Sequence, residues 1–174
     1  MDITKLAEKI KLLILDVDGV LTDGGIIFDS LDREIKVFHV RDGHGIKLLQ
    51  SAGIIVCIIT GRNSDVVSRR AKELSIGDVF QGAKNKADAF EKIKSRYGFS
   101  DNEIACMGDD INDIPLFKRV GLPIAVNDSA EELKVYAKYI TSKVGGKGAV
   151  REVCELILKA QGRWQSIIDE YLQS

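Results

Sequence analysis

The first apolar run of the chain, Leu12 to Leu15, ends directly in the sequence Asp16-Val17-Asp18-Gly19. A short apolar run bounded by glycine is typical of a buried strand. Two carboxylates therefore follow that strand at its carboxyl end, where open α/β sheets bind their ligands. Carboxylates this close repel each other unless a cation or a shared proton relieves them, and Mg²⁺ is the simplest hard cation for this purpose. The motif predicts a metal-assisted reaction on an anionic group.

Strand-like runs alternate with amphipathic runs along the whole chain, a pattern typical of an α/β protein with a doubly wound parallel sheet. We expect core strands at residues 12–16, 54–60, 78–81, 104–107 and 122–126, with a short sixth strand at 139–141. We expect helices at residues 43–52, 64–74, 85–97, 114–120 and 129–137. One domain over residues 1–174 follows, and it ends in a helix at about 149–172 that can break at Gly162.

The segment between the first strand and its helix predicts a β-hairpin insertion at about residues 24–40. Ile26 to Asp29 and Glu34 to Val40 are separated by the polar turn Ser30 to Arg33. The insertion is too short for a large cap domain. It carries more apolar side chains than an isolated hairpin should expose, so we expect a partner subunit to cover it and close the site to water; folding back on its own domain is the alternative. These side chains are Ile26, Ile27, Phe28, Ile35, Val37 and Phe38.

Charge and cysteine usage exclude several classes of protein. The net charge is −1, so binding to nucleic acid has no electrostatic driving force. Met1 to Lys11 is a polar lead-in unlike a signal peptide, and no apolar stretch approaches the ~20 residues that span a bilayer. Cys57, Cys106 and Cys154 lack metal-type spacing and are expected to be reduced. We expect a cytoplasmic protein with neither a nucleic-acid nor a membrane partner.

Polar residues follow two further core strands at the points where these end. Thr60-Gly61-Arg62 follows the second strand, and Gly108-Asp109-Asp110 follows the fourth, with Asp113 shortly after. Lys86 begins the helix after the third strand. Parallel strands with right-handed connections end at one edge of the sheet, so these clusters can converge. Each cluster alone could be a turn, a cap or a solvated helix face, but their order and spacing together are hard to obtain by chance.

These residue types fit the hydrolysis of a phosphate monoester, one of the slowest uncatalysed reactions. Asp16 can attack phosphorus and form an acyl-phosphate. Asp18 can protonate the leaving alkoxide and then deprotonate the attacking water. Asp109 can complete the coordination of Mg²⁺. Thr60 can donate its hydroxyl to a phosphoryl oxygen, and Lys86 can neutralise charge on the equatorial oxygens.

The combination of these four motifs resembles the haloacid dehalogenase-like (HAD) superfamily of phosphohydrolases, and the resemblance covers the whole chain. It implies Asp16 as the nucleophile and metal ligand, and Asp18 as the acid/base with its backbone carbonyl on Mg²⁺. It also implies Asp109 as the second side-chain ligand of the metal. Asp110 and Asp113 would hold the metal shell in place. The expected fold is the HAD-like Rossmannoid core with the hairpin insertion.

A narrower resemblance rests on four segments, Asp18 to Gly24, His39 to Gly43, Gln81-Gly82 before Lys86, and Gly145 to Glu152. They are similar to those of the 3-deoxy-D-manno-octulosonate 8-phosphate (KDO 8-phosphate) phosphatases. That family removes phosphate from an eight-carbon sugar acid in lipopolysaccharide biosynthesis. The resemblance implies a Mg²⁺-dependent homotetramer in which the hairpin and C-terminal segment of a neighbour help to close each site.

The substrate of that family carries a carboxylate as well as a phosphate, and arginine suits the bidentate recognition of carboxylates. By the resemblance, the substrate-contacting residues are Asp18, His39, Val40, Arg41, Asp42, Gly43, Lys47, Arg62, Arg70 and Lys86. Lys47 and Arg70 lie on amphipathic helices, where solvation is the alternative. His39 can contribute backbone contacts alone.

Three other readings compete with this one. A signalling receiver domain has similar ingredients, but its phosphorylated Asp follows the third strand, and Val79 to Gln81 here has none at its end. A second reading is a different substrate, a nine-carbon acid 9-phosphate of the neuraminate type. Arg62 directly after Thr60-Gly61 and the run Val40 to Gly43 favour the octulosonate over this nine-carbon acid. A former enzyme domain kept for oligomerisation is disfavoured by the complete set of acids.

Overall fold

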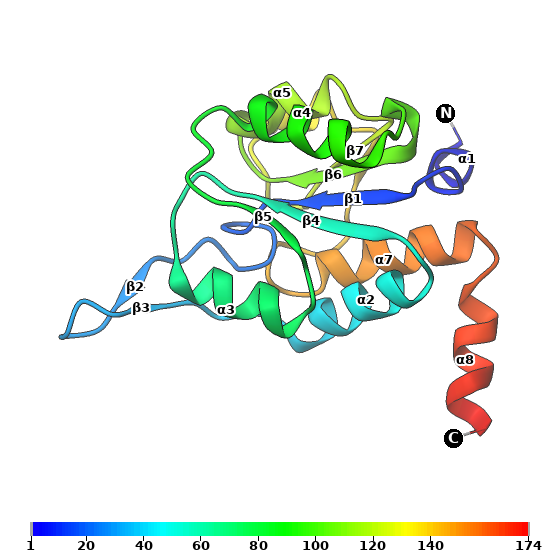
Figure 1. Cartoon of the computed structure of the whole chain (residues 1–174), viewed down its shortest axis with the longest axis horizontal. Helices are drawn as coiled ribbons and strands as arrows, with labels where there is room; N and C mark the ends of the chain where they lie inside the picture. The colour runs from blue at the N-terminus through cyan, green and yellow to red at the C-terminus, as the bar shows by residue number, and fades with distance from the viewer. Residues whose placement is uncertain (1, 174) are drawn as a thin grey trace.

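The computed structural model describes residues 2–173 and places a six-stranded parallel sheet between two layers of helices (Figure 1). The strand order is β5-β4-β1-β6-β7-β8, so the first strand of the chain lies inside the sheet and pairs with β4 and β6. This α/β architecture and the short sixth strand confirm the prediction. The strands are β1 (Leu12–Leu15), β4 (Ile55–Ile59), β5 (Asp78–Phe80), β6 (Ile104–Gly108), β7 (Leu122–Ala125) and β8 (Tyr139–Ile140).

Strand β1 is apolar throughout because both faces of the sheet are covered. Leu13 and Leu15 face one hydrophobic cluster, and Leu12 and Ile14 face another. The first cluster is formed with α2 (Val40–Ser51), α3 (Asp65–Glu73) and α7 (Ala149–Ala160). The second is formed with α4 (Lys86–Tyr97), α5 (Ile114–Phe117) and α6 (Glu131–Lys134). Three short helices complete this layer structure: α1 (Ile3–Ala7), η1 (Asp101–Glu103) and η2 (Ile111–Asp113).

Local sequence signals set several helix ends. The Ser64 hydroxyl accepts a hydrogen bond from the Val67 amide, which confirms Ser64 as the N-cap of α3. Gly98 ends α4 in the left-handed conformation, with φ of +67°. Helix α2 begins at Val40, three residues before the predicted start at Gly43. Its glycines are poor helix formers, but Gly43 and Gly45 let α2 pack closely on α3 and α7, so tertiary packing overrides propensity.

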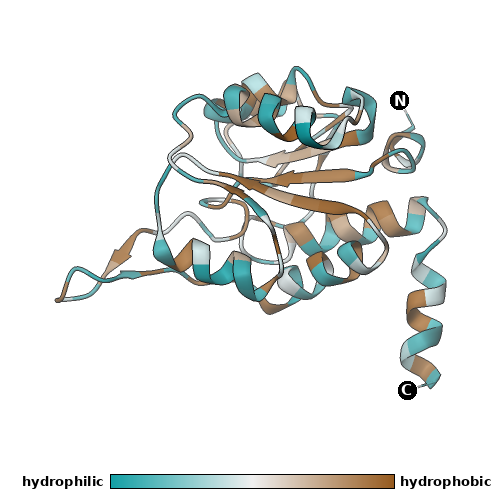
Figure 2. Ribbon diagram, viewed as in Figure 1, coloured by the Kyte–Doolittle hydropathy of each residue, from teal (hydrophilic) through white to brown (hydrophobic). Residues whose placement is uncertain are grey.

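The hairpin consists of β2 (Ile27–Phe28) and β3 (Glu34–Ile35), and it projects away from the sheet (Figure 1). Apolar segments lie on its protruding part (Figure 2). Most of its apolar side chains are exposed in the single chain, with Phe28 at 56% and Leu31 at 69%, whereas Phe38, also expected to be exposed, packs against the core at the base of the hairpin. The hairpin therefore does not fold back on its own domain. Between β1 and α2 it is the sole insertion, which confirms the expected lack of a cap domain.

The C-terminal region breaks at Gly162, with φ of +67°, and continues as α8 (Trp164–Gln173) at an angle to α7 (Figure 1). Ile167 packs against the core, whereas Leu172 is 79% exposed. Cys57, Cys106 and Cys154 are buried free thiols, as predicted. Within residues 2–173, we find no helix with the length and apolar character needed to cross a membrane.

Candidate active site

The polar clusters predicted from the sequence meet at the carboxyl edge of the sheet. They line a cavity of about 270 Å³ formed by the segments that follow β1, β4 and β6. The convergence results from the parallel direction of these strands, which brings their ends to one edge. The lining residues are Asp16, Asp18, Gly24, Thr60, Gly61, Arg62, Asp109, Asp110 and Asn112.

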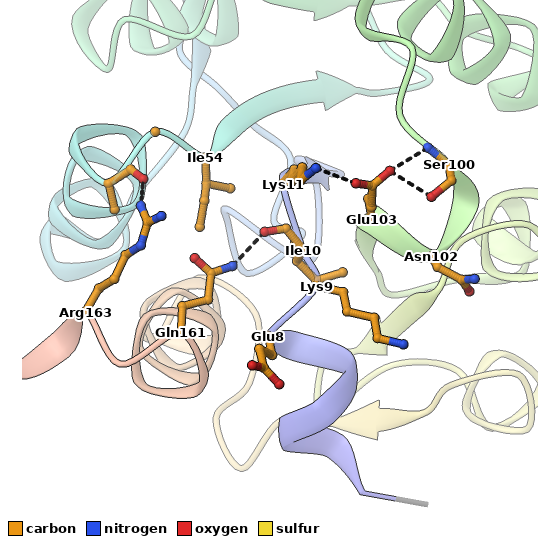
Figure 3. Close-up of a pocket in the computed structure, with 12 residues that line it drawn as sticks. Glu8, Lys9, Ile10, Lys11, Ile54, Ser100, Asn102, Glu103, Gln161 and Arg163 are labelled. Atoms are coloured by element: carbon orange, nitrogen blue, oxygen red, sulfur yellow. Dashed lines mark hydrogen bonds and ion pairs between the residues drawn. The ribbon is translucent and has the colours of Figure 1, made fainter.

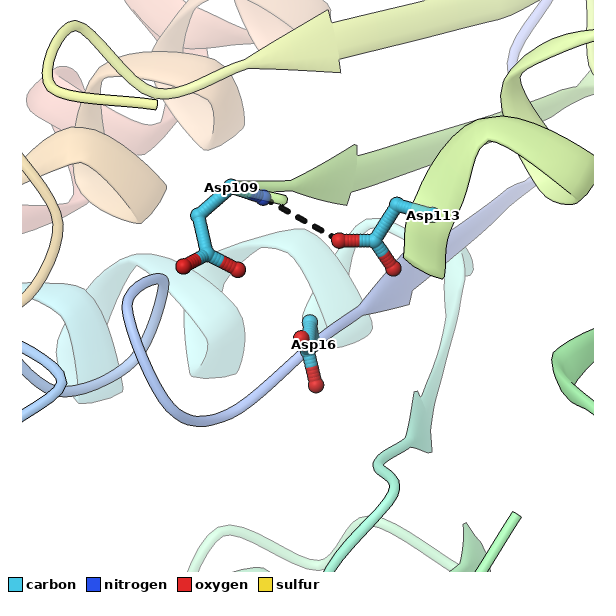
Figure 4. Close-up of side chains that lie close together, drawn as sticks. All are labelled: Asp16, Asp109 and Asp113. Carbon is cyan, nitrogen blue, oxygen red and sulfur yellow. Dashed lines mark hydrogen bonds between the residues drawn. The ribbon is translucent and has the colours of Figure 1, made fainter. Parts of the chain in front are cut away.

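Three carboxylates gather at the inner end of this site (Figure 4). Asp16, Asp109 and Asp113 each offer an oxygen, and these oxygens lie within 4.8 Å of one another. Burial, followed by the charges of Asp16 and Asp113, raises the pKa of Asp109 to about 7. Burial and Asp16 likewise raise the pKa of Asp113. Hard oxygen ligands in this arrangement fit a divalent cation such as Mg²⁺.

Lys86 is the cation that touches this acidic cluster. Its Nζ lies 2.8 Å from Oδ2 of Asp16 and 2.6 Å from Oδ1 of Asp113. Burial lowers the pKa of Lys86, but the two carboxylates outweigh burial and raise the pKa overall, so the side chain stays protonated. Its position at the first turn of α4 is set by Asn85, whose side chain caps the helix. One cation beside three carboxylates leaves negative charge that a divalent ion can balance.

Glycines allow the carboxylates to approach the backbone. Gly19 has φ of +93°, and a Cβ there would lie 2.0 Å from Oδ2 of Asp109. The turn after Asp18 can therefore pass beside Asp109 only with glycine at this position. Asp113 is held by the Asp109 amide, which donates to its Oδ2 at 3.1 Å. Asp110 is exposed, and its carboxylate accepts a hydrogen bond from the Ile111 amide at the start of η2.

The carboxylate of Asp18 contacts two basic side chains and is not one of the three carboxylates of the acidic cluster. Its carboxylate forms an ion pair with Lys36, and its Oδ2 lies 3.7 Å from Nε of Arg62. Thr60 is buried at the end of β4, on the wall of the same cavity. Asp16 and Asp18 thus share one strand end but have different partners.

Sequence reasoning missed Glu34 and Lys36, which the hairpin brings to this site. The Lys36 side chain is only 1% exposed, and Glu34 accepts a hydrogen bond from Nη2 of Arg62 at 2.9 Å. A hydrogen bond from Ser64 lowers the pKa of Glu34, burial opposes this, and Lys36 lowers it further. The sequence signal that could have found them is the alternation of side chains along a strand. Glu34 and Lys36 are two residues apart and so lie on one face, whereas Ile35 and Val37 lie on the other face and are exposed.

Two of the predicted substrate-contacting residues, His39 and Arg41 at the start of α2, do not line the cavity that contains Asp16. His39 and Arg41 line a separate cavity of about 670 Å³ beside the start of α7. Asp42 is buried and accepts hydrogen bonds from the amides of Gly148 and Arg151. Asp42 therefore fixes the start of α7 rather than facing the acidic cluster.

The other predicted contacts are also separated from Asp16 in this chain. Lys47 lines a cavity of about 520 Å³ beside α8, and its Nζ donates to Ser75. Arg70 lines a third cavity of about 410 Å³ with Val40, and it pairs with Glu73. Gly43 packs against the guanidinium of Arg70. Of the predicted substrate contacts, Asp18, Arg62 and Lys86 are the ones that the described residues bring to the acidic cluster or its cavity.

A larger cavity, of about 770 Å³, lies at the opposite edge of the sheet (Figure 3). It is lined by residues that precede β1, β4 and β6 and by Gln161 and Arg163, which follow α7. Its polar groups bond mainly to one another and to the backbone: Lys11 pairs with Glu103 at 2.6 Å, and Gln161 donates to the Ile10 carbonyl at 2.7 Å. Size alone therefore does not locate the chemistry, which needs the carboxylates at the other edge.

Comparisons with known proteins agree with this geometry. A family model described as haloacid dehalogenase-like hydrolase matches residues 71–153. The chain is 45% identical over 162 residues to the 3-deoxy-D-manno-octulosonate 8-phosphate phosphatase KdsC of Escherichia coli K12, covering 93% of this chain and 86% of that protein.

Solved structures give the same relationship. The phosphatase of Moraxella catarrhalis, in complex with magnesium ion, phosphate ion and KDO, is 44% identical with a TM-score of 0.95, over 97% of both chains. The phosphatase of Yersinia pestis is 42% identical with a TM-score of 0.92, over 93% of this chain and 88% of that one. The chain described here therefore belongs to the 3-deoxy-D-manno-octulosonate 8-phosphate phosphatase family of haloacid dehalogenase-like hydrolases.

Proposed function

We propose that this chain is a Mg²⁺-dependent phosphatase that releases phosphate from KDO 8-phosphate and so supplies a sugar acid for lipopolysaccharide. The observation that carries the proposal is the cluster of Asp16, Asp109 and Asp113 around Lys86, with Asp18 on the adjoining wall of one cavity. The family relationship supplies the substrate, because the Moraxella relative is described as a complex with magnesium, phosphate and KDO. Residues 1–174 would form one hydrolase domain.

The residues present fit the metal. Asp16 and Asp109 would hold Mg²⁺ through carboxylate oxygens, together with the backbone carbonyl of Asp18. Asp113 would support the metal site by accepting a hydrogen bond from the Asp109 amide. Asp110, on the wall of the cavity, would also support it. When bound, the ion supplies positive charge that lets an anionic phosphate approach an anionic nucleophile.

The first half of the reaction transfers the phosphoryl group to the protein. A carboxylate oxygen of Asp16 bonds to phosphorus, the bond from phosphorus to the ester oxygen breaks, and Asp18 gives its proton to the leaving alkoxide. The Thr60 hydroxyl donates to a phosphoryl oxygen, and Lys86 offsets charge beside Asp16. The products of this step are the free sugar acid and an aspartyl phosphate on Asp16.

The second half regenerates the enzyme. The Asp18 carboxylate takes a proton from a water molecule, and the water oxygen bonds to phosphorus while the bond to Asp16 breaks. Inorganic phosphate leaves, and Asp18 again carries the proton that the next cycle needs. Ester and water are consumed, alcohol and phosphate are formed, and neither Asp16 nor Asp18 is changed.

A homotetramer in which neighbours complete each site is the further part of this proposal. Support comes from the exposed apolar side chains of the hairpin, which an isolated chain has no reason to carry. Further support comes from His39, Arg41, Lys47 and Arg70, which line other cavities than the one that contains Asp16 and so stand where another chain could reach them. They stay predicted substrate contacts.

The replacement Asp16→Asn tests the proposed function directly. We expect phosphate release from KDO 8-phosphate to fall by roughly three orders of magnitude or more, because the amide cannot act as the nucleophile. The measurement is phosphate release with and without a chelator, alongside circular dichroism to show that the fold is retained. Asp88→Asn, at an exposed site on α4, is the matched control and should keep full activity. Substantial turnover by Asp16→Asn would remove Asp16 from its role.

Metal binding should depend on pH through Asp109. Because its pKa is raised in the folded chain to about 7, the metal-free protein loses stability as pH rises through that value, and Mg²⁺ restores it. We expect Mg²⁺ at a hundredfold excess over its Kd to raise the Tm at pH 8 by about 5–10 °C, and by much less at pH 5. Scanning fluorimetry measures this, and Asp109→Asn should remove most of the difference. Equal shifts at both pH values would contradict this account.

Arg62 should select the sugar acid rather than the phosphate. We expect Arg62→Ala to lower kcat/KM for KDO 8-phosphate by about 10–100-fold, the size of a lost charge-assisted hydrogen bond, and to change kcat/KM for para-nitrophenyl phosphate far less. A panel that includes a nine-carbon acid 9-phosphate also decides between the two substrates. Arg119→Ala, on the opposite layer, is the control. An equal loss on both phosphates would place Arg62 on the phosphoryl group instead.

The hairpin should be needed for assembly. We expect Phe28→Asp to reduce the mass measured by light scattering from about four chains toward one, and to lower activity on the sugar phosphate, because a charge replaces an apolar contact. Val135→Asp, at a residue that is 80% exposed at the end of α6, should leave both unchanged. A wild-type protein that is monomeric and fully active would contradict the proposal that neighbouring subunits complete each active site.

A further inference from the structure

Lys36 is a buried cation that the mechanism above does not use. Its neighbours on the hairpin, Ile35 and Val37, are exposed, yet its own side chain is 1% exposed. Lysine is rarely buried to this degree unless it is paired. Its Nζ forms an ion pair with Oδ1 of Asp18 and lies 3.3 Å from Oε1 of Glu34. The hairpin thus delivers a positive charge to the carboxyl group that moves protons in the proposed reaction.

Glu34 joins this lysine to Arg62. Its Oε1 accepts a hydrogen bond from Nη2 of Arg62 at 2.9 Å, and its Oε2 accepts one from the Ser64 hydroxyl. Arg62 in turn faces the second oxygen of Asp18 at 3.7 Å. Asp18, Lys36, Glu34 and Arg62 therefore form a closed ring of alternating charge, which we call the charge ring. Its members come from the loop after β1, the hairpin, and the connection between β4 and α3.

The charge ring provides positive charge where the proposed reaction creates a negative charge on Asp18. When Asp18 gives its proton to the leaving alkoxide, it becomes an anion on the wall of a cavity that already contains Asp16, Asp109 and Asp110. Like charges in a poorly solvated site repel one another strongly. Lys36 offers the compensating charge at contact distance from Asp18. It also restricts the rotation of the carboxylate, which must aim first at the ester oxygen and then at water.

We propose that Lys36 is a positioning residue for the catalytic Asp18 and that Glu34 holds Lys36 in place. The hairpin then contributes to catalysis within its own chain, in addition to any role in assembly. This inference rests on the proposed function, because it assigns Lys36 a task in the transfer of protons by Asp18. A lysine that merely anchors the hairpin is the other outcome, and the two differ in their dependence on the leaving group.

The test compares Lys36→Met with Lys36→Arg on two phosphate esters. A sugar alkoxide needs a proton to leave, whereas para-nitrophenolate leaves readily without one. We expect Lys36→Met to lower kcat on KDO 8-phosphate by about 10–100-fold with KM nearly unchanged, and to lower kcat on para-nitrophenyl phosphate several-fold less. Lys36→Arg keeps the charge and should recover part of the loss. Glu34→Gln should show the same selectivity to a smaller degree.

Controls separate this inference from folding, assembly and the proposed function itself. Lys92→Met, at an exposed position of α4, should behave as wild type, and light scattering must give each variant the wild-type mass. If the wild-type protein does not accept KDO 8-phosphate, the proposed function fails, and the same comparison is made with another alkyl phosphate that it hydrolyses. An equal loss of kcat on both esters, or no loss at all, would overturn the role of Lys36.

Discussion

Repulsion between carboxylates at the carboxyl edge of the sheet is the constraint on which the site depends. Asp16, Asp109 and Asp113 bring their oxygens within 4.8 Å of one another in a largely buried place. Lys86 compensates part of this charge, while burial, followed by the charges of Asp16 and Asp113, raises the pKa of Asp109. In the proposed function a divalent ion would supply the missing charge, so the crowding of carboxylates would also create the affinity for Mg²⁺ and, through it, for phosphate.

The sheet tolerates this concentration of charge because the backbone around it is fixed. Strand β1 is paired on both sides and buried on both faces, so Asp16 leaves a rigid element rather than a mobile loop. Glycine occupies the two positions where a side chain would collide with a carboxylate. A Cβ at Gly108 would lie 2.4 Å from Oδ2 of Asp113, much as one at Gly19 would meet Asp109. The precision of the cluster therefore originates in packing and in the absence of side chains.

The hairpin has two faces with different physical purposes. Most of its apolar side chains are exposed to solvent in the single chain, and the proposed tetramer would cover them. Glu34 and Lys36 turn the other way and join Asp18 and Arg62. The strand period of two separates these faces, so assembly and catalysis can use the same short segment without competing for residues.

The sequence by itself determined the elements and the chemistry that local signals encode. Apolar runs located the strands, Ser64 and Gly98 marked helix ends, and the acids after successive strands predicted where they would meet. Only the tertiary structure decided that Lys36 meets Asp18, 18 residues away, and that Lys86 meets Asp113, 27 residues away. Such pairings depend on the path of the hairpin and on contacts between distant segments. The local periodicity of the sequence does not predict contacts between residues this far apart, because the free energy that stabilises them arises only when the segments pack together.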